Sequence, residues 1–136
     1  MLVVDTSAVL EALVARDPPS GLVARLANDG DLHAPHLIDV EVLHALRRLN
    51  AGGHLSEERS LDARLDFAAL AVIRYPHIGL ADRIWALRQN LTACDAAFVA
   101  LAEELHVPLV TCDKRLGASA GHFATIEVFA LPDRGT

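Results

Sequence analysis

The first ten residues decide the fold, and they are Met1-Leu-Val-Val-Asp5-Thr-Ser-Ala-Val-Leu10. The apolar run Leu2–Val4 predicts a short strand, and a helical pattern follows at once, from about Ser7 to Ala15. Asp5 lies at the junction, where Asp is a favoured helix N-cap. The same position is the carboxyl end of a strand, where open α/β folds bind their ligands. Asp5 is therefore a candidate both for a cap and for a site residue.

The rest of the chain repeats this alternation of strands and helices. Further strands are predicted at about 32–34, 70–73, 108–111 and 126–129, and helices at about 22–26, 37–50, 56–67, 80–90 and 93–105. The helix over 80–90 should carry Ile84, Trp85 and Leu87 on its apolar side, and the helix over 93–105 should be deeply buried. The alternation predicts an α/β fold with a central, mostly parallel β-sheet of about five strands, covered by helices on both faces.

The composition fits one globular domain. The chain has 136 residues, is 52% hydrophobic and has a mean hydropathy of +0.30. We expect a single domain over residues 1–131 and a loose C-terminal tail over 132–136. No signal peptide and no membrane-spanning run are visible, so a cytoplasmic protein is expected. The two cysteines, Cys94 and Cys112, form no CxxC motif and are expected to be small buried residues.

Three further acids occupy positions comparable with that of Asp5. Asp113 follows the strand predicted at 108–111, where it could also be an ordinary turn residue. Asp95 lies in the first turn of a buried helix and could complete a capping box with Thr92. On the helix over 37–50, periodicity does not choose between Glu41, which borders the apolar arc, and Asp39, which points elsewhere.

Parallel strands and the helices that follow them would bring these acids to one edge of the sheet. At about 4 Å and an effective dielectric constant near 20, each like-charged pair would cost roughly 4 kcal/mol unless a cation or protons offset it. Oxygen ligands without histidine or thiolate suit Mg²⁺ or Mn²⁺. Such an ion can activate water for hydrolysis of a phosphodiester. The sequence therefore predicts a metal-dependent hydrolase site.

Four segments around these acids resemble the PIN-domain nucleases, and most closely the VapC toxins of type II toxin–antitoxin systems. The first is the opening stretch already quoted. The others are Ala34-Pro-His-Leu-Ile-Asp-Val-Glu41-Val-Leu-His-Ala-Leu-Arg-Arg48, Leu91-Thr-Ala-Cys-Asp95-Ala-Ala-Phe-Val-Ala-Leu-Ala-Glu103 and Val107-Pro-Leu-Val-Thr-Cys-Asp113-Lys-Arg-Leu116. Their order and spacing fit over nearly the whole chain. Cys94 and Phe98 depart from the family pattern, because tyrosine is common at both positions.

The resemblance implies a three-layer α/β/α sandwich and a Mg²⁺- or Mn²⁺-dependent endoribonuclease that hydrolyses RNA with a metal-activated water. It also implies a homodimer and a cognate VapB-like antitoxin that forms a heterocomplex and blocks the site. The implied catalytic, metal-binding carboxylates are Asp5, Glu41, Asp95 and Asp113. In this pattern Glu41, and not Asp39, is the acid of its helix. Thr6 and Thr111 resemble the supporting polar residues near the metal.

The net charge of the chain bears on whether it can bind RNA. The net charge of −6 is unfavourable for a nucleic-acid partner, although bound metal ions would reverse the local sign. Four basic residues near the acids could line a path for RNA phosphates: Arg47, Arg48, Lys114 and Arg115. The alternative for these residues is ordinary solvated charge.

Two other functions stay open from the sequence. A receiver-like signalling module also places acids, Thr and Lys at strand ends, but Asp5 has no acidic neighbour and no Asp ends the strand predicted at 70–73. The chain could also be a catalytically inactive PIN fold that is retained for partner binding.

Overall fold

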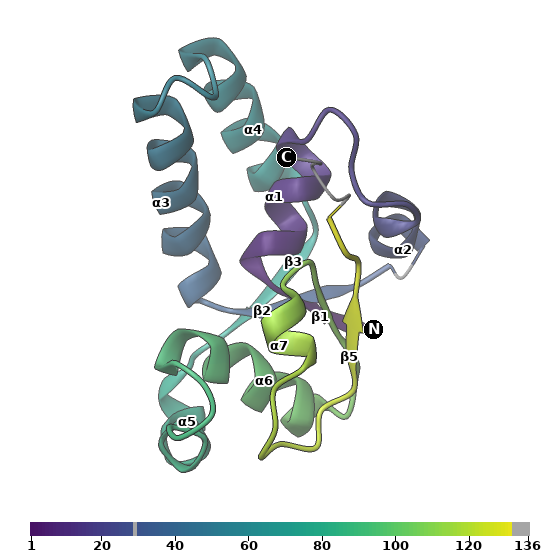
Figure 1. Ribbon diagram of the computed structural model, residues 1–136, viewed down its shortest axis with the longest axis vertical. Helices are drawn as coiled ribbons and strands as arrows, with labels where there is room; N and C mark the ends of the chain where they lie inside the picture. Colours follow the sequence, from purple (N-terminus) through teal and green to yellow (C-terminus); the bar gives the residue numbers. More distant parts are fainter. Residues whose placement is uncertain (29, 132–136) are drawn as a thin grey trace.

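The computed structural model describes residues 1–28 and 30–131. Its centre is a five-stranded parallel sheet with the strand order β3-β2-β1-β4-β5 (Figure 1). The strands are β1 (Leu2–Val4), β2 (Leu32–Pro35), β3 (Val72–Tyr75), β4 (Leu109–Thr111) and β5 (Ile126–Val128). This sheet confirms the predicted α/β class.

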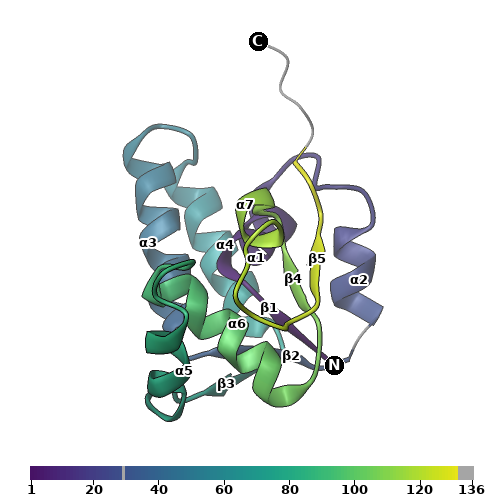
Figure 2. The same cartoon turned by 60° about the horizontal axis from the view of Figure 1, so that its bottom comes forward.

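Helices cover both faces of the sheet and make a three-layer α/β/α sandwich. Figure 1 shows α1 (Thr6–Val14), α3 (Leu37–Ala51) and α4 (Glu57–Ala69) above the sheet, where they pack on one another. Below the sheet, α6 (Ala93–Leu105) lies across β1, β2 and β4, and it packs against η1 (Ile78–Leu80) and α5 (Ala81–Ala86). Figure 2 shows α2 (Leu22–Asn28) beside β5, and the short α7 (Lys114–Gly117) packs on β4 and β5.

The core explains why the central elements look so apolar in the sequence. Every residue of β1 and β4 is buried, since these strands are covered on both faces. Residues 96–103 of α6 are all buried, which confirms the prediction for that helix. Four of these eight buried residues are alanines: Ala96, Ala97, Ala100 and Ala102. Among the described residues, no helix is long and apolar enough to cross a membrane.

The strand order creates a topological switch point between β1 and β4. From β1 the chain moves outward through β2 to β3, and then returns past both strands to form β4 on the other side of β1. Right-handed crossovers put the helices of the outward path on one face and those of the return path on the other. In open α/β sheets, ligands bind at the carboxyl ends of the strands at such a point. Asp5 and Asp113 follow the two strands that flank it.

The structure corrects several local expectations. Strand β3 begins two residues later than predicted, because α4 extends to Ala69 and Leu70 caps that helix, and β3 ends at Tyr75. The helix predicted over 80–90 is only the six residues of α5, and Trp85 is exposed instead of lying on the apolar side. Cys112 is buried as expected, but Cys94 is exposed. Helix α7 was not predicted, and the tail predicted over 132–136 lies outside the described residues.

Candidate active site

Asp5 is a buried carboxylate with three hydrogen-bond donors, and only 7% of the residue is exposed. Its Oδ1 accepts from the backbone N–H of Ala8 (3.0 Å) and from the Ser7 hydroxyl (2.7 Å), and its Oδ2 accepts from the Thr111 hydroxyl (2.5 Å). The bond to Ala8 makes Asp5 the N-cap of α1. Capping uses one oxygen, so the cap and a site role are compatible.

The environment of Asp5 opposes its negative charge. Burial raises the pKa of the Asp5 carboxyl, the hydrogen bonds from Thr111, Ala8 and Ser7 lower it, and the charge of Asp95 raises it again, with a net upward shift. Neutral hydroxyl and amide donors thus do not fully replace water around this carboxylate. A group in this state gains from a nearby cation.

Ser7 is the residue that the sequence analysis did not place in the site. Its hydroxyl donates to Asp5 and accepts the backbone N–H of Cys112 (3.0 Å), while the Thr111 hydroxyl accepts the N–H of Asp113 (3.0 Å). These bonds tie the end of β1 to the end of β4. The only signal for Ser7 in the sequence is its position two residues after Asp5, where a hydroxyl is also a common cap.

The structure separates Glu41 from Asp39. The Thr6 hydroxyl donates to Glu41 Oε1 (2.7 Å), so Glu41 faces α1 and the end of β1. Asp39 instead accepts two bonds from the Arg74 guanidinium of β3 (2.7 and 2.8 Å). Asp39 therefore has a structural partner on β3, and Glu41 is the acid of this helix that is bonded to Thr6, the residue next to Asp5.

Asp95 enters the same region from the other face of the sheet. Thr92 caps α6 by accepting the backbone N–H of Asp95 (3.2 Å), as the capping-box pattern predicts for that half of the motif. The Asp95 charge acts on Asp5, and together with Glu41 it acts on Cys94, whose thiol pKa is raised by desolvation first and then by these two acids. Asp95 thus lies within electrostatic reach of Asp5, and both Asp95 and Glu41 lie within reach of Cys94.

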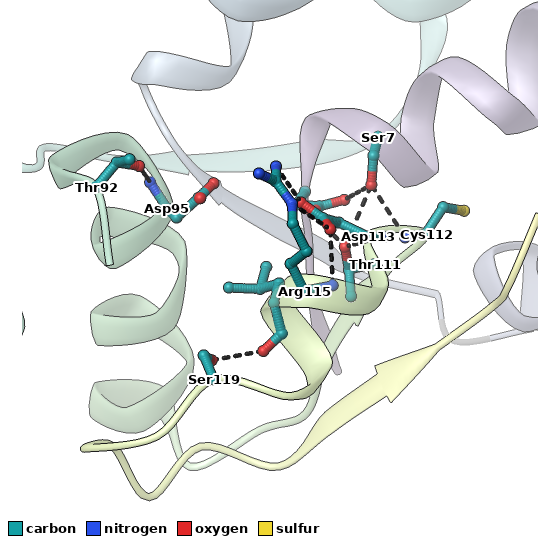
Figure 3. Close-up of polar contacts among 10 residues, drawn as sticks. Ser7, Thr92, Asp95, Thr111, Cys112, Asp113, Arg115 and Ser119 are labelled. Atoms are coloured by element: carbon teal, nitrogen blue, oxygen red, sulfur yellow. Dashed lines mark hydrogen bonds and ion pairs between the residues drawn. The ribbon is translucent and has the colours of Figure 1, made fainter. Parts of the chain in front are cut away.

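Asp113 caps α7 and is held by its own neighbour Arg115. Asp113 Oδ1 accepts the backbone N–H of Arg115 (2.9 Å), and the Arg115 guanidinium approaches Oδ2 with Nη2 (3.3 Å) and Oδ1 with Nε (3.5 Å). Figure 3 shows this guanidinium between Asp113 and the carboxylate of Asp95. The other basic candidates, Arg47, Arg48 and Lys114, are exposed.

We call the set Asp5, Glu41, Asp95 and Asp113 the acidic edge. Within the described part of the chain, no three His, Cys, Asp or Glu side chains are close enough to enclose a metal ion. The acids therefore share one edge of the sheet but do not form a closed cage. An all-oxygen set of this kind still fits Mg²⁺, because that ion keeps several waters and needs only one or two carboxylates.

A five-stranded parallel sandwich with an acidic edge at its switch point defines a class of proteins, and the comparisons agree with it. The family model for the PIN domain matches residues 2–121, so the chain belongs to the PIN-domain family. Ribonuclease VapC12 of Mycobacterium tuberculosis is 42% identical over 130 residues, covering 96% of this chain and all of that protein. VapC ribonuclease Mb0985 of Mycobacterium bovis is 46% identical over 116 residues, covering 85% and 88%. Within the family, the chain is a relative of the VapC ribonucleases.

Solved structures support the same fold at lower sequence identity. PAE2754 from Pyrobaculum aerophilum superimposes with a TM-score of 0.68 at 24% identity and covers 93% of this chain and 83% of its own. VapC20 of Mycobacterium tuberculosis, described as a sarcin–ricin loop cleaving toxin, gives a TM-score of 0.64 at 18% identity, covering 90% and 97%. A receiver-like module is excluded, because flavodoxin-like sheets have the order 2-1-3-4-5 and this sheet has the order 3-2-1-4-5.

Proposed function

We propose that this protein is the toxin of a type II toxin–antitoxin pair and a Mg²⁺- or Mn²⁺-dependent endoribonuclease. The observation that carries the proposal is the buried Asp5 carboxylate at the switch point, with Glu41, Asp95 and Asp113 on the same edge. The names of the relatives, ribonucleases at 42 and 46% identity, support the same activity.

The roles of the residues follow from their bonds. Asp5 and Asp95 would hold the divalent ion together with Glu41 and Asp113, and the ion would supply an activated water and an electrophile for the phosphate. Ser7 and Thr111 hold both oxygens of Asp5 in place. Thr6 holds one oxygen of Glu41 by donating a hydrogen bond to its Oε1. Positioning of this kind fixes the acids before substrate arrives, so their orientation costs little during the reaction.

The basic side chains near the acidic edge would bind the RNA backbone. Arg47 and Arg48 extend from the helix of Glu41, while Lys114 and Arg115 follow Asp113, and all four are exposed. With a net charge of −6, the protein as a whole repels RNA, so this local contribution must be large enough to offset that repulsion. Binding should therefore weaken steeply with added salt.

Two exposed apolar regions suit the expected protein partners. Val40 and Leu43 flank Glu41 on α3, so an antitoxin segment that covered them would also block the acidic edge. Ile73, Ile78 and Trp85 lie exposed on β3, η1 and α5, and we assign this second region to a homodimer. A cytoplasmic location follows from an RNA substrate and an antitoxin partner.

The test is incubation of the purified protein with total RNA in Mg²⁺, in Mn²⁺ and in chelator, followed by mapping of the new ends. We expect discrete cuts that require the ion and that disappear in Asp5→Asn and Asp95→Asn. Intact RNA in all three conditions, from a folded protein that still binds Mn²⁺ and a partner antitoxin, would favour the inactive PIN fold instead.

A further inference from the structure

The four acids of the acidic edge differ in what holds them. Asp5 is bound by two hydroxyls and a backbone amide, and Glu41 by the hydroxyl of Thr6. Asp113 is the member whose carboxylate is approached by a cation, the guanidinium of Arg115. The charge of Asp95 also acts on this guanidinium, whose pKa is raised first by the hydrogen bond to Asp113 and then by the charges of Asp113 and Asp95. One arginine is thus shared by two acids of the site.

The ion pair between Arg115 and Asp113 is weak. Its distances of 3.3 and 3.5 Å are at the long end for a hydrogen bond, and 91% of the Arg115 side chain is exposed. Exposed ion pairs of this kind contribute little to stability. The backbone N–H of Arg115 already satisfies Asp113 as the cap of α7, so the guanidinium is not needed for that turn.

We propose that Arg115 is a built-in counter-ion of the acidic edge, which competes with the divalent metal for Asp113 and thereby lowers the metal affinity of the empty site. The inference rests on the proposed function, because it requires a divalent ion at these acids. Arg115 is a positioning residue in this role: it acts through Asp113 and near Asp95. Metal binding at Asp113 would release the Arg115 guanidinium. A phosphate group near the acidic edge could then accept hydrogen bonds from it.

Lys114 provides a matched control. It precedes Arg115 in the same short helix, carries the same charge and is also exposed, but it makes no bond to the acidic edge among the described residues. Removing either side chain changes the net charge by one unit. A general electrostatic effect on metal binding should therefore be similar in Lys114→Ala and Arg115→Ala, and only a direct competition separates them.

The experiment is calorimetric titration of the purified protein with Mn²⁺ alone, without RNA. We expect Arg115→Ala to bind Mn²⁺ about two- to fivefold more tightly than Lys114→Ala, the range that exposed ion pairs give. In the background of Asp113→Asn, replacing Arg115 should change the affinity no more than replacing Lys114 does. Thermal unfolding of each variant checks that it folds.

Two outcomes would refute different statements. Equal Mn²⁺ affinities for Arg115→Ala and Lys114→Ala, or an Arg115 effect that persists without the Asp113 carboxylate, would overturn the counter-ion and leave the metal site standing. A folded wild-type protein that binds no Mn²⁺ would overturn the proposed function, and the inference with it.

Discussion

At the scale of single residues, the proposed site depends on the negative charge of Asp5, which burial disfavours. Because Asp5 is buried, the pKa of its carboxyl is higher in the folded chain than in the unfolded one. The unfolded chain therefore gives up this proton at lower pH, and the stability of the fold falls as the pH rises through the folded pKa. The protein carries this cost at neutral pH, and the proposed role of Asp5 as a metal ligand requires the ionised carboxylate.

Asp5→Asn tests whether the Asp5 charge lowers the stability of the fold while it is required for RNA cleavage. We expect no RNA cleavage and, in the absence of metal, a higher unfolding temperature than the wild type at pH 7.5. The difference should shrink as the pH is lowered toward 4, because the wild-type carboxyl then becomes neutral as well. Thermal unfolding across this pH range checks the prediction, and a lower unfolding temperature for Asp5→Asn at neutral pH would contradict it.

Thr111→Val tests the hydroxyl that donates to Asp5 Oδ2. The substitution keeps the shape of the side chain and removes a donor to a charged group, which costs about 1.5–3 kcal/mol. We expect cleavage to fall by roughly tenfold or more at pH 7, with partial recovery at higher pH, because the pKa of Asp5 rises further. Thr111→Ser keeps the hydroxyl and should stay close to wild type; an equal loss in both variants would point to packing instead.

Some residue-level choices could not be made from the sequence because the deciding partners are distant. Glu41 and Asp39 differ by the donors that they meet, Thr6 and Arg74, and each of these lies 35 positions away along the chain. Periodicity describes one helix and contains no information about those neighbours. The resemblance to PIN domains selected Glu41, and the bond to Thr6 gives the physical reason for its orientation.

At the scale of elements, helix ends position the acids. Thr92→Ala removes the N-cap of α6 and should lower the free energy of unfolding by about 1 kcal/mol. Because the cap binds the N–H of Asp95 itself, we also expect weaker Mn²⁺ binding, which titration can measure. Thr92→Ser retains the cap and serves as the control. Unchanged Mn²⁺ affinity in Thr92→Ala would show that α6 places Asp95 without it.

A partly buried ion pair, in which Glu103 is buried and Arg83 is partly exposed, joins α5, α6 and the loop before β5. Arg83 donates two bonds to Glu103 (2.8 and 2.9 Å), and the N–H of Phe123 donates a third (3.0 Å). Burial by itself would raise the pKa of Glu103, but the bonds from Arg83 and Phe123 and the charges of Arg83 and His122 outweigh it and hold the pKa below 4.5. The carboxylate therefore adds stability above that pH and loses it as the pH falls.

Arg83→Ala should destabilise the fold by about 2–3 kcal/mol at pH 7, because it leaves a buried carboxylate with one donor. The loss should diminish as the pH falls below 4.5, because the carboxyl of Glu103 takes up its proton first in the unfolded chain and at lower pH in the folded one. Chemical denaturation at pH 7 and pH 4 measures both values. Arg88→Ala, which removes an exposed arginine stacked on Trp85, should change stability by less than about 0.5 kcal/mol.

The sequence predicted the bounds of helices and strands well where the element is buried in the core, because burial produces a regular apolar pattern. It predicted them poorly where the element is exposed or very short. Helix α6 matches its predicted bounds, since the sheet buries nearly all of it. Strand β3 is at the edge of the sheet, so its pattern is only half apolar and its start was misplaced by two residues. Helix α7 has four residues, which is too short for any periodic signal.

At the scale of the whole molecule, the alternation of strands and helices was enough to predict a parallel sheet with two covered faces. The order of the strands could not be predicted in this way. After β3 the chain can place β4 at either edge of the sheet, and the alternation of elements does not decide which. The expected gathering of the acids is only partial. In the described part of the chain the four acids lie on one edge without forming a closed set, and Arg115 partly compensates the charge of Asp113.

The proposed homodimer is tested by Trp85→Glu. Trp85 is 68% exposed, and burying an aromatic side chain of this size at an interface contributes strongly to association. We expect the wild type to be dimeric at micromolar concentration and Trp85→Glu to be monomeric, as measured by light scattering after gel filtration. Val23→Glu, an exposed apolar position on α2, is the control. A monomeric wild type would contradict the assignment.

The pairing of β1 with β4 has a consequence for synthesis of the protein. The ribosome makes Asp5 first, but the Thr111 hydroxyl that completes its surroundings is made 106 residues later. A nascent chain that has folded only as far as β3 still lacks the residues that β4 contributes to the site. Any activity of the acidic edge therefore requires β4, and a chain that ends before β4 lacks both Thr111 and Asp113.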